Sequence, residues 1–106
     1  MAISFTHKGT DYTLEFTRDS IKQMERVGFS IETAASQPVT ALETLFKGAF
    51  SAHHPRISQN VIKEIWDDLD DKNGLFEALI ELYSEPLEAL FKEPEEGKKI
   101  EWKVVK

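Results

Sequence analysis

Residues 3–16 alternate between apolar and polar positions. The apolar positions on one face are Ile3, Phe5, Tyr12, Leu14 and Phe16. A period of two residues, interrupted by the short polar connection Lys8-Gly9, is typical of a β-hairpin. Because an isolated hairpin is only marginally stable in water, we expect its apolar face to pack against a helix, another strand or a partner chain.

Beyond residue 16 the apolar positions recur every three to four residues, which predicts helices. The first helix is expected between a cap at Thr17 or Asp19 and a stop at Gly28. The segment SIETAAS fits a helical turn, and Pro38 then begins a helix that is expected to end near His53. The apolar stripe of this helix consists of Val39, Leu42, Leu45, Phe46, Ala49 and Phe50.

A further helical pattern follows a capping residue at Ser58, and its apolar face consists of Val61, Ile62, Ile65, Trp66 and Leu69. An acidic stretch then separates it from the longest apolar pattern, residues 75–91, whose apolar positions cover roughly half of the helix surface. Pro86 divides that segment in two if Ser84 caps a new helix, and otherwise the helix is continuous. The whole pattern predicts an α+β fold, with an N-terminal β-hairpin followed by a bundle of four to five short helices.

The C-terminal residues differ from the rest in pattern and charge. We expect residues 1–92 to form a single domain, and residues 93–106 to be a polar linker with a basic tail. The last residues, KIEWKVVK, alternate only in part, so both a final strand and a flexible tail are open. Residues 60–96 hold 12 acidic and 3 basic side chains, whereas residues 97–106 hold 4 lysines and 1 glutamate. The tail therefore either folds back on the acidic helices or is free to meet another molecule.

Composition narrows the function classes. A chain of 106 residues with 41% apolar residues fits one small domain. A net charge of −6 argues against nucleic acid as the main partner, because phosphate binding requires clustered Lys and Arg. The absence of cysteine excludes disulfides, a thiolate nucleophile and a cysteine zinc site. No signal peptide and no apolar run of about 18 residues is found, so we expect no membrane span, and the cysteine-free composition suits a reducing cytoplasm.

The acidic stretch DDLDDKNG, residues 67–74, superficially resembles a calcium loop. An EF-hand loop requires oxygen ligands at positions 1, 3 and 5, glycine at 6 and glutamate at 12. With Gly74 at position 6, position 1 is Leu69, and starting at Asp70 or Asp68 places Lys72 at a ligand position. We therefore expect this stretch to be a polar elbow, in which Asp71 or Asn73 caps the following helix.

Other candidate chemistry is weaker still. The adjacent residues His53 and His54 do not share a helix face, and His7 is expected far away in the hairpin. No nucleophile elbow and no phosphate-binding loop occurs in the sequence. The sequence therefore predicts a binding protein rather than an enzyme, with no metal, no cofactor and no catalytic residues.

The apolar half of the 75–91 segment is wider than a surface helix of a small domain requires. One interpretation is that this helix is central and surrounded by the hairpin and the other helices. The other is that part of its face binds another chain. In that case the expected partner-binding residues are Trp66, Leu82, Tyr83, Leu87 and Phe91.

The order of the elements resembles a known family. Residues 5–16, FTHKGTDYTLEF, follow the pattern F-x-x-K/N-G-x-x-Y-x-L-x-F and lead directly into TRDSIKQMERVGFSIE, LFKGAF…HHPRIS and LIELYSE. Over residues 3 to 92 this arrangement is similar to the tail assembly chaperones of long-tailed phages and prophages.

The resemblance implies a protein of the bacterial host cytoplasm that binds the tape-measure protein, the tail tube protein or both. Such a protein keeps its partner soluble before the tail polymerises. Self-association into a homo-oligomer stays open. The alternatives are a head-tail connector or other minor structural phage protein, and a small acidic regulatory or antitoxin-like binding protein.

Overall fold

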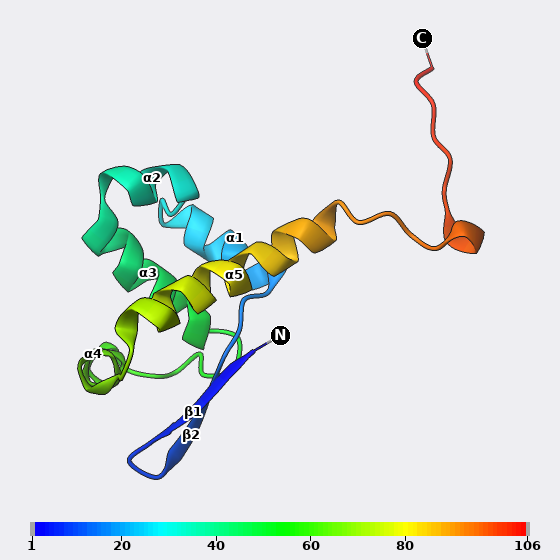
Figure 1. The fold of residues 1–106 in the computed structure, drawn as a ribbon. Helices are drawn as coiled ribbons and strands as arrows, with labels where there is room; N and C mark the ends of the chain where they lie inside the picture. The colour runs from blue at the N-terminus through cyan, green and yellow to red at the C-terminus, as the bar shows by residue number, and fades with distance from the viewer. Residues whose placement is uncertain (1, 106) are drawn as a thin grey trace.

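The computed structural model describes residues 2–105, and the side chains at positions 31, 33, 35 and 96 are outside that description. The expected domain, residues 1–92, therefore begins with one residue outside the described part of the chain, and the expected tail, residues 93–106, ends with one. An antiparallel hairpin is followed by five α-helices, one of them of only six residues, and by a short 3-10 turn (Figure 1). The expected α+β fold is confirmed.

The hairpin consists of β1 (Ile3–His7) and β2 (Thr10–Leu14). Its two turn residues, Lys8 and Gly9, have φ values of 50° and 80°. This pair of positive φ values is the combination that a type I′ turn requires, and it matches the natural twist of the strands. The position of the glycine in the short polar connection therefore predicts the hairpin correctly.

The apolar face of the hairpin packs on helix α3 (Pro38–Phe50). Phe5 lies opposite Tyr12 in the register and stacks on it, with ring centroids 5.5 Å apart. Both rings meet Phe50 edge-on, at 6.4 and 5.9 Å. Each such aromatic pair contributes roughly 0.5–1.5 kcal/mol beyond the burial of its surface. The helix that the marginal hairpin requires is therefore α3.

Helix α1 (Arg18–Arg26) begins with a reciprocal cap. The hydroxyl of Thr17 accepts a hydrogen bond from the Ser20 N–H at 3.1 Å, and the Ser20 hydroxyl accepts one from the Thr17 N–H at 2.8 Å. Between α1 and α3 the packing is close, because a Cβ on Gly48 would lie 2.5 Å from the sulfur of Met24. Only a residue without a side chain fits at that point without a shift of its neighbour.

Helices α2 (Ile31–Ser36) and α3 are separated by one residue, and Pro38 occupies the first turn of α3 as expected. The apolar stripe of α3 is buried over its C-terminal half, at Leu45, Phe46, Ala49 and Phe50. Val39 was expected in that stripe but is 72% exposed. The stripe thus contacts the core only over the part of α3 that lies against the hairpin, α1 and α5.

Helix α4 (Gln59–Asp68) starts at the expected cap, where the Ser58 hydroxyl accepts from the Val61 N–H at 3.3 Å. Its residues Ile62 and Ile65 are buried, and the Trp66 ring meets Phe46 edge-on at 5.1 Å. Trp66 itself is half-buried. Helix α4 therefore contributes one face to the core and presents the other to solvent.

Helix α5 (Lys72–Leu90) is continuous and contains Pro86. Ser84 does not cap a second helix; its hydroxyl donates instead to the carbonyl of Ile80, one turn earlier, at 3.0 Å. A proline removes a single backbone donor, and Pro86 lies within the last turns of the helix, so one lost hydrogen bond does not divide the segment. Of the two alternatives for Pro86, the structure has the uninterrupted helix.

The chain after α5 leaves the helices. A 3-10 turn, η1 (Glu96–Lys98), is followed by residues that form neither helix nor strand up to residue 105. Among residues 2–105 the sheet has two strands, so the final strand that the sequence left open is not formed. Figure 1 shows this segment extending away from the helices, in keeping with principal dimensions of 57 × 32 × 25 Å.

The hydrophobic core lies between the hairpin and the helices. Its largest fully buried side chains are Phe50, Leu14, Leu45, Ile65, Leu79 and Leu82. They come from β2, α3, α4 and α5, so one continuous core joins the hairpin to the helical part.

Candidate protein-binding surface

The C-terminal part of α5 exposes apolar side chains. In the middle of the helix, Leu79, Leu82 and Tyr83 are buried, whereas beyond Pro86 the side chain of Phe91 is 84% exposed. Figure 1 shows the reason, because the end of α5 runs out past the other helices toward the tail. The apolar stripe of α5 therefore continues beyond the elements that cover it.

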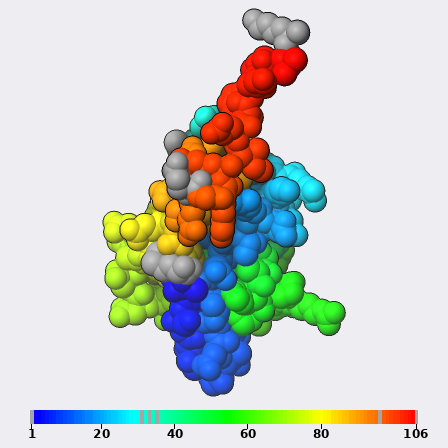
Figure 2. Space-filling view, turned by 90° about the vertical axis from the view of Figure 1, so that its right-hand side faces the viewer, coloured from blue at the N-terminus to red at the C-terminus, as the bar shows by residue number. Residues whose placement is uncertain are grey.

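The tail adds further apolar side chains to this end of the molecule. Trp102 is 81% exposed, and its neighbours in the tail are similarly uncovered. Figure 2 faces the side from which the tail leaves, and the tail projects beyond the rest of the surface in orange and red. We call the exposed apolar residues at the end of α5 and in the tail the C-terminal apolar surface: Leu87, Leu90, Phe91, Ile100, Trp102, Val104 and Val105.

The five partner-binding residues expected from the sequence do not share one surface. Leu82 and Tyr83 are 1% and 4% exposed, and the Tyr83 ring lies between Phe16 and Phe29, with centroids 5.4 Å from each. Burial raises the pKa of the Tyr83 phenol above its ordinary value, and the nearby charge of Glu25 adds to the rise. These two side chains belong to the core, which corrects their placement on a binding face.

The other three expected residues remain accessible to different degrees. Trp66 is half-buried against Phe46, whereas Leu87 and Phe91 are exposed. The periodicity thus identified an apolar half-cylinder, but only its middle packs on the core, whereas Phe76 near its start and the residues beyond Pro86 are exposed. The surface is centred about one turn later than expected and continues into the tail.

An open hollow of about 440 Å³ runs along another face of α5. It is lined by Glu77, Ile80, Glu81, Ser84, Glu85 and Glu88. Four of these six side chains are carboxylates, so the hollow is acidic and adjoins the C-terminal apolar surface. A partner that contacts both would need apolar side chains flanked by basic ones.

The acidic elbow is organised by the two helices that it joins. Asp71 has a left-handed backbone, with φ of 48°, and its carboxylate accepts from the Gly74 N–H at 3.1 Å as the cap of α5. The ammonium of Lys72 donates to the carbonyls of Asp67 and Leu69, at 3.3 and 2.9 Å, at the C-terminus of α4. A cation at a helix C-terminus is favourable, so the expected cap and the local lysine account for this stretch.

All three histidines connect the hairpin region to the helical part. His53 contacts Glu15 at 2.7 Å, and His54 accepts a hydrogen bond from the Thr13 N–H at 3.0 Å. His7 Nε2 lies 3.0 Å from Asp68 Oδ2 on α4. This contact holds the pKa of the Asp68 carboxyl below its ordinary value. The histidines therefore do not converge on one another.

The structure brings together a cluster of side chains that the sequence did not predict. Three side chains of metal-ligating type, His7, Glu64 and Asp68, have ligand atoms within 4.8 Å of one another. The neighbouring Lys8 ammonium contacts Glu64, and this carboxylate raises the pKa of the lysine. The four-residue spacing of Glu64 and Asp68 places both on one helix face and was a usable signal, but nothing in the sequence joins them to His7.

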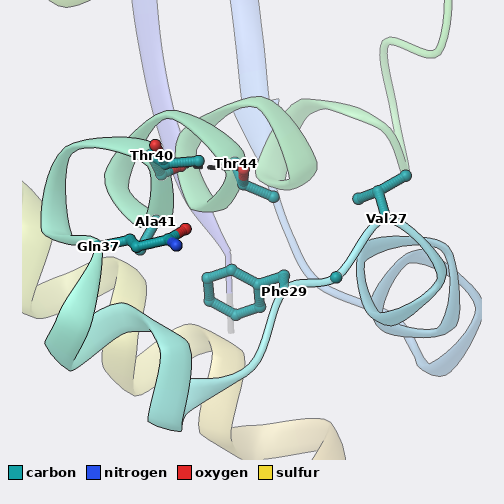
Figure 3. Close-up of a pocket in the computed structure, with 7 residues that line it drawn as sticks. Val27, Phe29, Gln37, Thr40, Ala41 and Thr44 are labelled. Carbon is teal, nitrogen blue, oxygen red and sulfur yellow. Dashed lines mark hydrogen bonds between the residues drawn. The ribbon is translucent and has the colours of Figure 1, made fainter.

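A small pocket lies beside the C-terminal end of α1 and the N-terminal half of α3 (Figure 3). Its volume is about 80 Å³, and the Phe29 ring forms part of its wall. The Thr44 hydroxyl beside it already donates to the Thr40 carbonyl at 3.0 Å. The pocket has room for a few water molecules and carries no charged side chain.

Across residues 2–105, none of the helices combines the length and the apolar character that crossing a membrane requires. The fold and surface define a small acidic α+β protein with an exposed apolar end. Residues 1–105 match the family described as "Domain of unknown function (DUF5055)", and the chain belongs to that family. No curated protein and no solved structure matches it significantly.

Proposed function

We propose that the protein is a non-enzymatic phage tail assembly chaperone of the bacterial host cytoplasm. In this role it binds the tape-measure protein, the tail tube protein or both, and keeps them soluble before the tail polymerises. The observation that supports the proposal best is the C-terminal apolar surface, whose seven apolar side chains are all exposed and which continues from the end of α5, the helix that also carries the acidic hollow. Exposed apolar patches of this kind mark interaction sites.

The chemistry of this surface suits a helical partner with an apolar seam. The end of α5 offers a short rigid ridge, while the tail offers an extended segment that can lie along a partner. Full burial of one side chain such as Phe91 contributes roughly 1.5–3 kcal/mol, which corresponds to about 10- to 150-fold in Kd. A few such residues therefore suffice for a specific complex. The acidic hollow would favour partners that carry basic side chains next to the apolar ones.

The test is co-expression of the full chain with a phage tape-measure protein and, separately, with a tail tube protein, with the soluble fraction of the partner as the readout. We expect the wild-type chain to keep the partner soluble and to be retained with it in a pull-down. The double variant Leu90→Asp/Phe91→Asp should lose both effects and keep its own melting temperature, because both positions are exposed.

The matched control is Val39→Asp, the same change at an exposed apolar side chain on α3, away from the C-terminal apolar surface. It should leave solubilisation intact. Equal loss in the control and the double variant would mean that any added acid disturbs binding, and would remove the proposed surface. A folded wild-type chain that binds neither tail protein would refute the chaperone function.

The alternatives give a different result in assembled particles. A chaperone is absent from purified mature tails, whereas a head-tail connector or other minor structural protein stays in them. A regulatory or antitoxin-like protein would bind a basic partner through the acidic hollow and would bind neither tail protein. Mass spectrometry of purified particles and the pull-down together separate these three functions.

A further inference from the structure

We propose that His7, Glu64 and Asp68 form a binding site for a first-row divalent metal ion of the Zn²⁺ class, bridging the hairpin and α4. The ligand atoms of these three side chains lie within 4.8 Å of one another. Imidazole and carboxylate groups are the nitrogen and oxygen ligands that Zn²⁺ takes at about 2.0–2.2 Å. The site goes beyond the proposed chaperone function and does not depend on it.

Two different elements bring the ligands together. Glu64 and Asp68 are four residues apart on α4, so they project from the same face of the helix. His7 is the last residue of β1, directly before the type I′ turn. The His7 side chain is only 15% exposed, so the imidazole is held in place beside Asp68 of α4.

The distances suit a single ion. Ligand atoms around a tetrahedral zinc ion are about 3.3–3.6 Å apart, as follows from bond lengths of about 2.0–2.2 Å. The His7 Nε2 to Asp68 Oδ2 separation is already 3.0 Å. The Glu64 carboxylate lies within 4.8 Å of both, so it must leave Lys8 and move toward them to reach the same centre. Three protein ligands would leave a fourth position for water, and the imidazole disfavours Mg²⁺ and Ca²⁺, which prefer oxygen ligands alone.

Lys8 is a built-in competitor for this site. Its ammonium contacts Glu64, so an arriving ion must displace it. Replacement of Lys8 by an uncharged residue should therefore strengthen metal binding. If the metal bound elsewhere on the protein, the same replacement would leave its affinity unchanged. Metal binding would also have a structural consequence. Helix α4 makes few close backbone contacts with the other elements, so an ion bound by His7, Glu64 and Asp68 would link this helix to the hairpin.

The experiment is calorimetric titration of the full chain, without a histidine tag, with ZnCl₂. Absorption of the Co²⁺ form in the visible range reports the coordination geometry. We expect one ion per chain and a rise in melting temperature on its addition, with no binding of Ca²⁺. His7→Gln and Asp68→Asn should weaken binding at least about tenfold, since even outer-shell changes cost that much. Lys8→Met should strengthen it.

The matched control is His53→Gln. His53 pairs with Glu15 much as His7 pairs with Asp68, but no third ligand joins that pair among the described residues. This variant should bind Zn²⁺ like the wild type. The proposal is overturned if Zn²⁺ binding is not saturable, if it is lost in His53→Gln rather than in His7→Gln, or if Lys8→Met leaves it unchanged in a folded chain.

Discussion

Replacement of Leu82 by alanine separates the part of α5 that belongs to the core from the part that is available to a partner. Leu82 is 1% exposed and lies in the cluster formed by the hairpin and the helices. A buried Leu→Ala change costs about 2–5 kcal/mol, because transfer free energy is lost and a cavity remains. Domains of this size have a total free energy of unfolding of only about 5–15 kcal/mol, so the loss is large.

Urea denaturation followed by circular dichroism measures this loss. With a loss of about 3 kcal/mol and a denaturant slope of about 1.5–2 kcal/mol per molar, the midpoint should fall by about 1.5–2 M. The slope itself should not change, because the surface exposed on unfolding is nearly the same. The matched control is Phe91→Ala at the C-terminal cap of the same helix, which should shift the free energy of unfolding by no more than about 0.5 kcal/mol.

The comparison of the two variants shows which part of α5 belongs to the core and which part belongs to the C-terminal apolar surface. If Leu82→Ala and Phe91→Ala lower the free energy of unfolding equally, then Phe91 is covered in solution and the C-terminal apolar surface is part of the fold. If Leu82→Ala has no effect, then α5 does not pack on the core as described. Either result would refute the division of α5 into a buried and an exposed part.

Three further predictions concern single residues. Thr17→Ala removes the acceptor for the Ser20 N–H and should lower the free energy of unfolding by about 1 kcal/mol, measured by urea denaturation; an unchanged midpoint would contradict the cap. Pro86→Ala restores a backbone donor within α5 and should raise the free energy of unfolding by about 1–3 kcal/mol; a loss would mean that the proline ring is needed for packing. The contact with His7 holds the pKa of Asp68 below its ordinary 3.8, so its contribution to stability is complete above that value and is lost as the pH falls through the lower folded-state pKa. Thermal melts between pH 2 and 5 should therefore show less acid sensitivity in Asp68→Asn than in the wild type, and identical pH profiles would exclude the pair.

Local features of this protein follow from its sequence alone. The alternation of residues 3–16 and the Lys8-Gly9 pair predict the hairpin, because strand pairing and turn type depend on neighbouring residues. The caps at Thr17, Ser58 and Asp71 satisfy backbone groups within a few residues of themselves. Such interactions need no distant partner, so they can be derived before the fold is known.

Only the tertiary structure decides which apolar residues are covered. The half-cylinder of α5 looks uniform in sequence, but Tyr83 lies between two phenylalanine rings from elsewhere in the chain, whereas Phe91 is 84% exposed. The same holds for His7 and Asp68, which are 61 positions apart and meet only because the fold brings their side chains together at the end of β1 and on α4. Burial and convergence depend on contacts between segments distant in sequence, and periodicity carries no information on which segments those are.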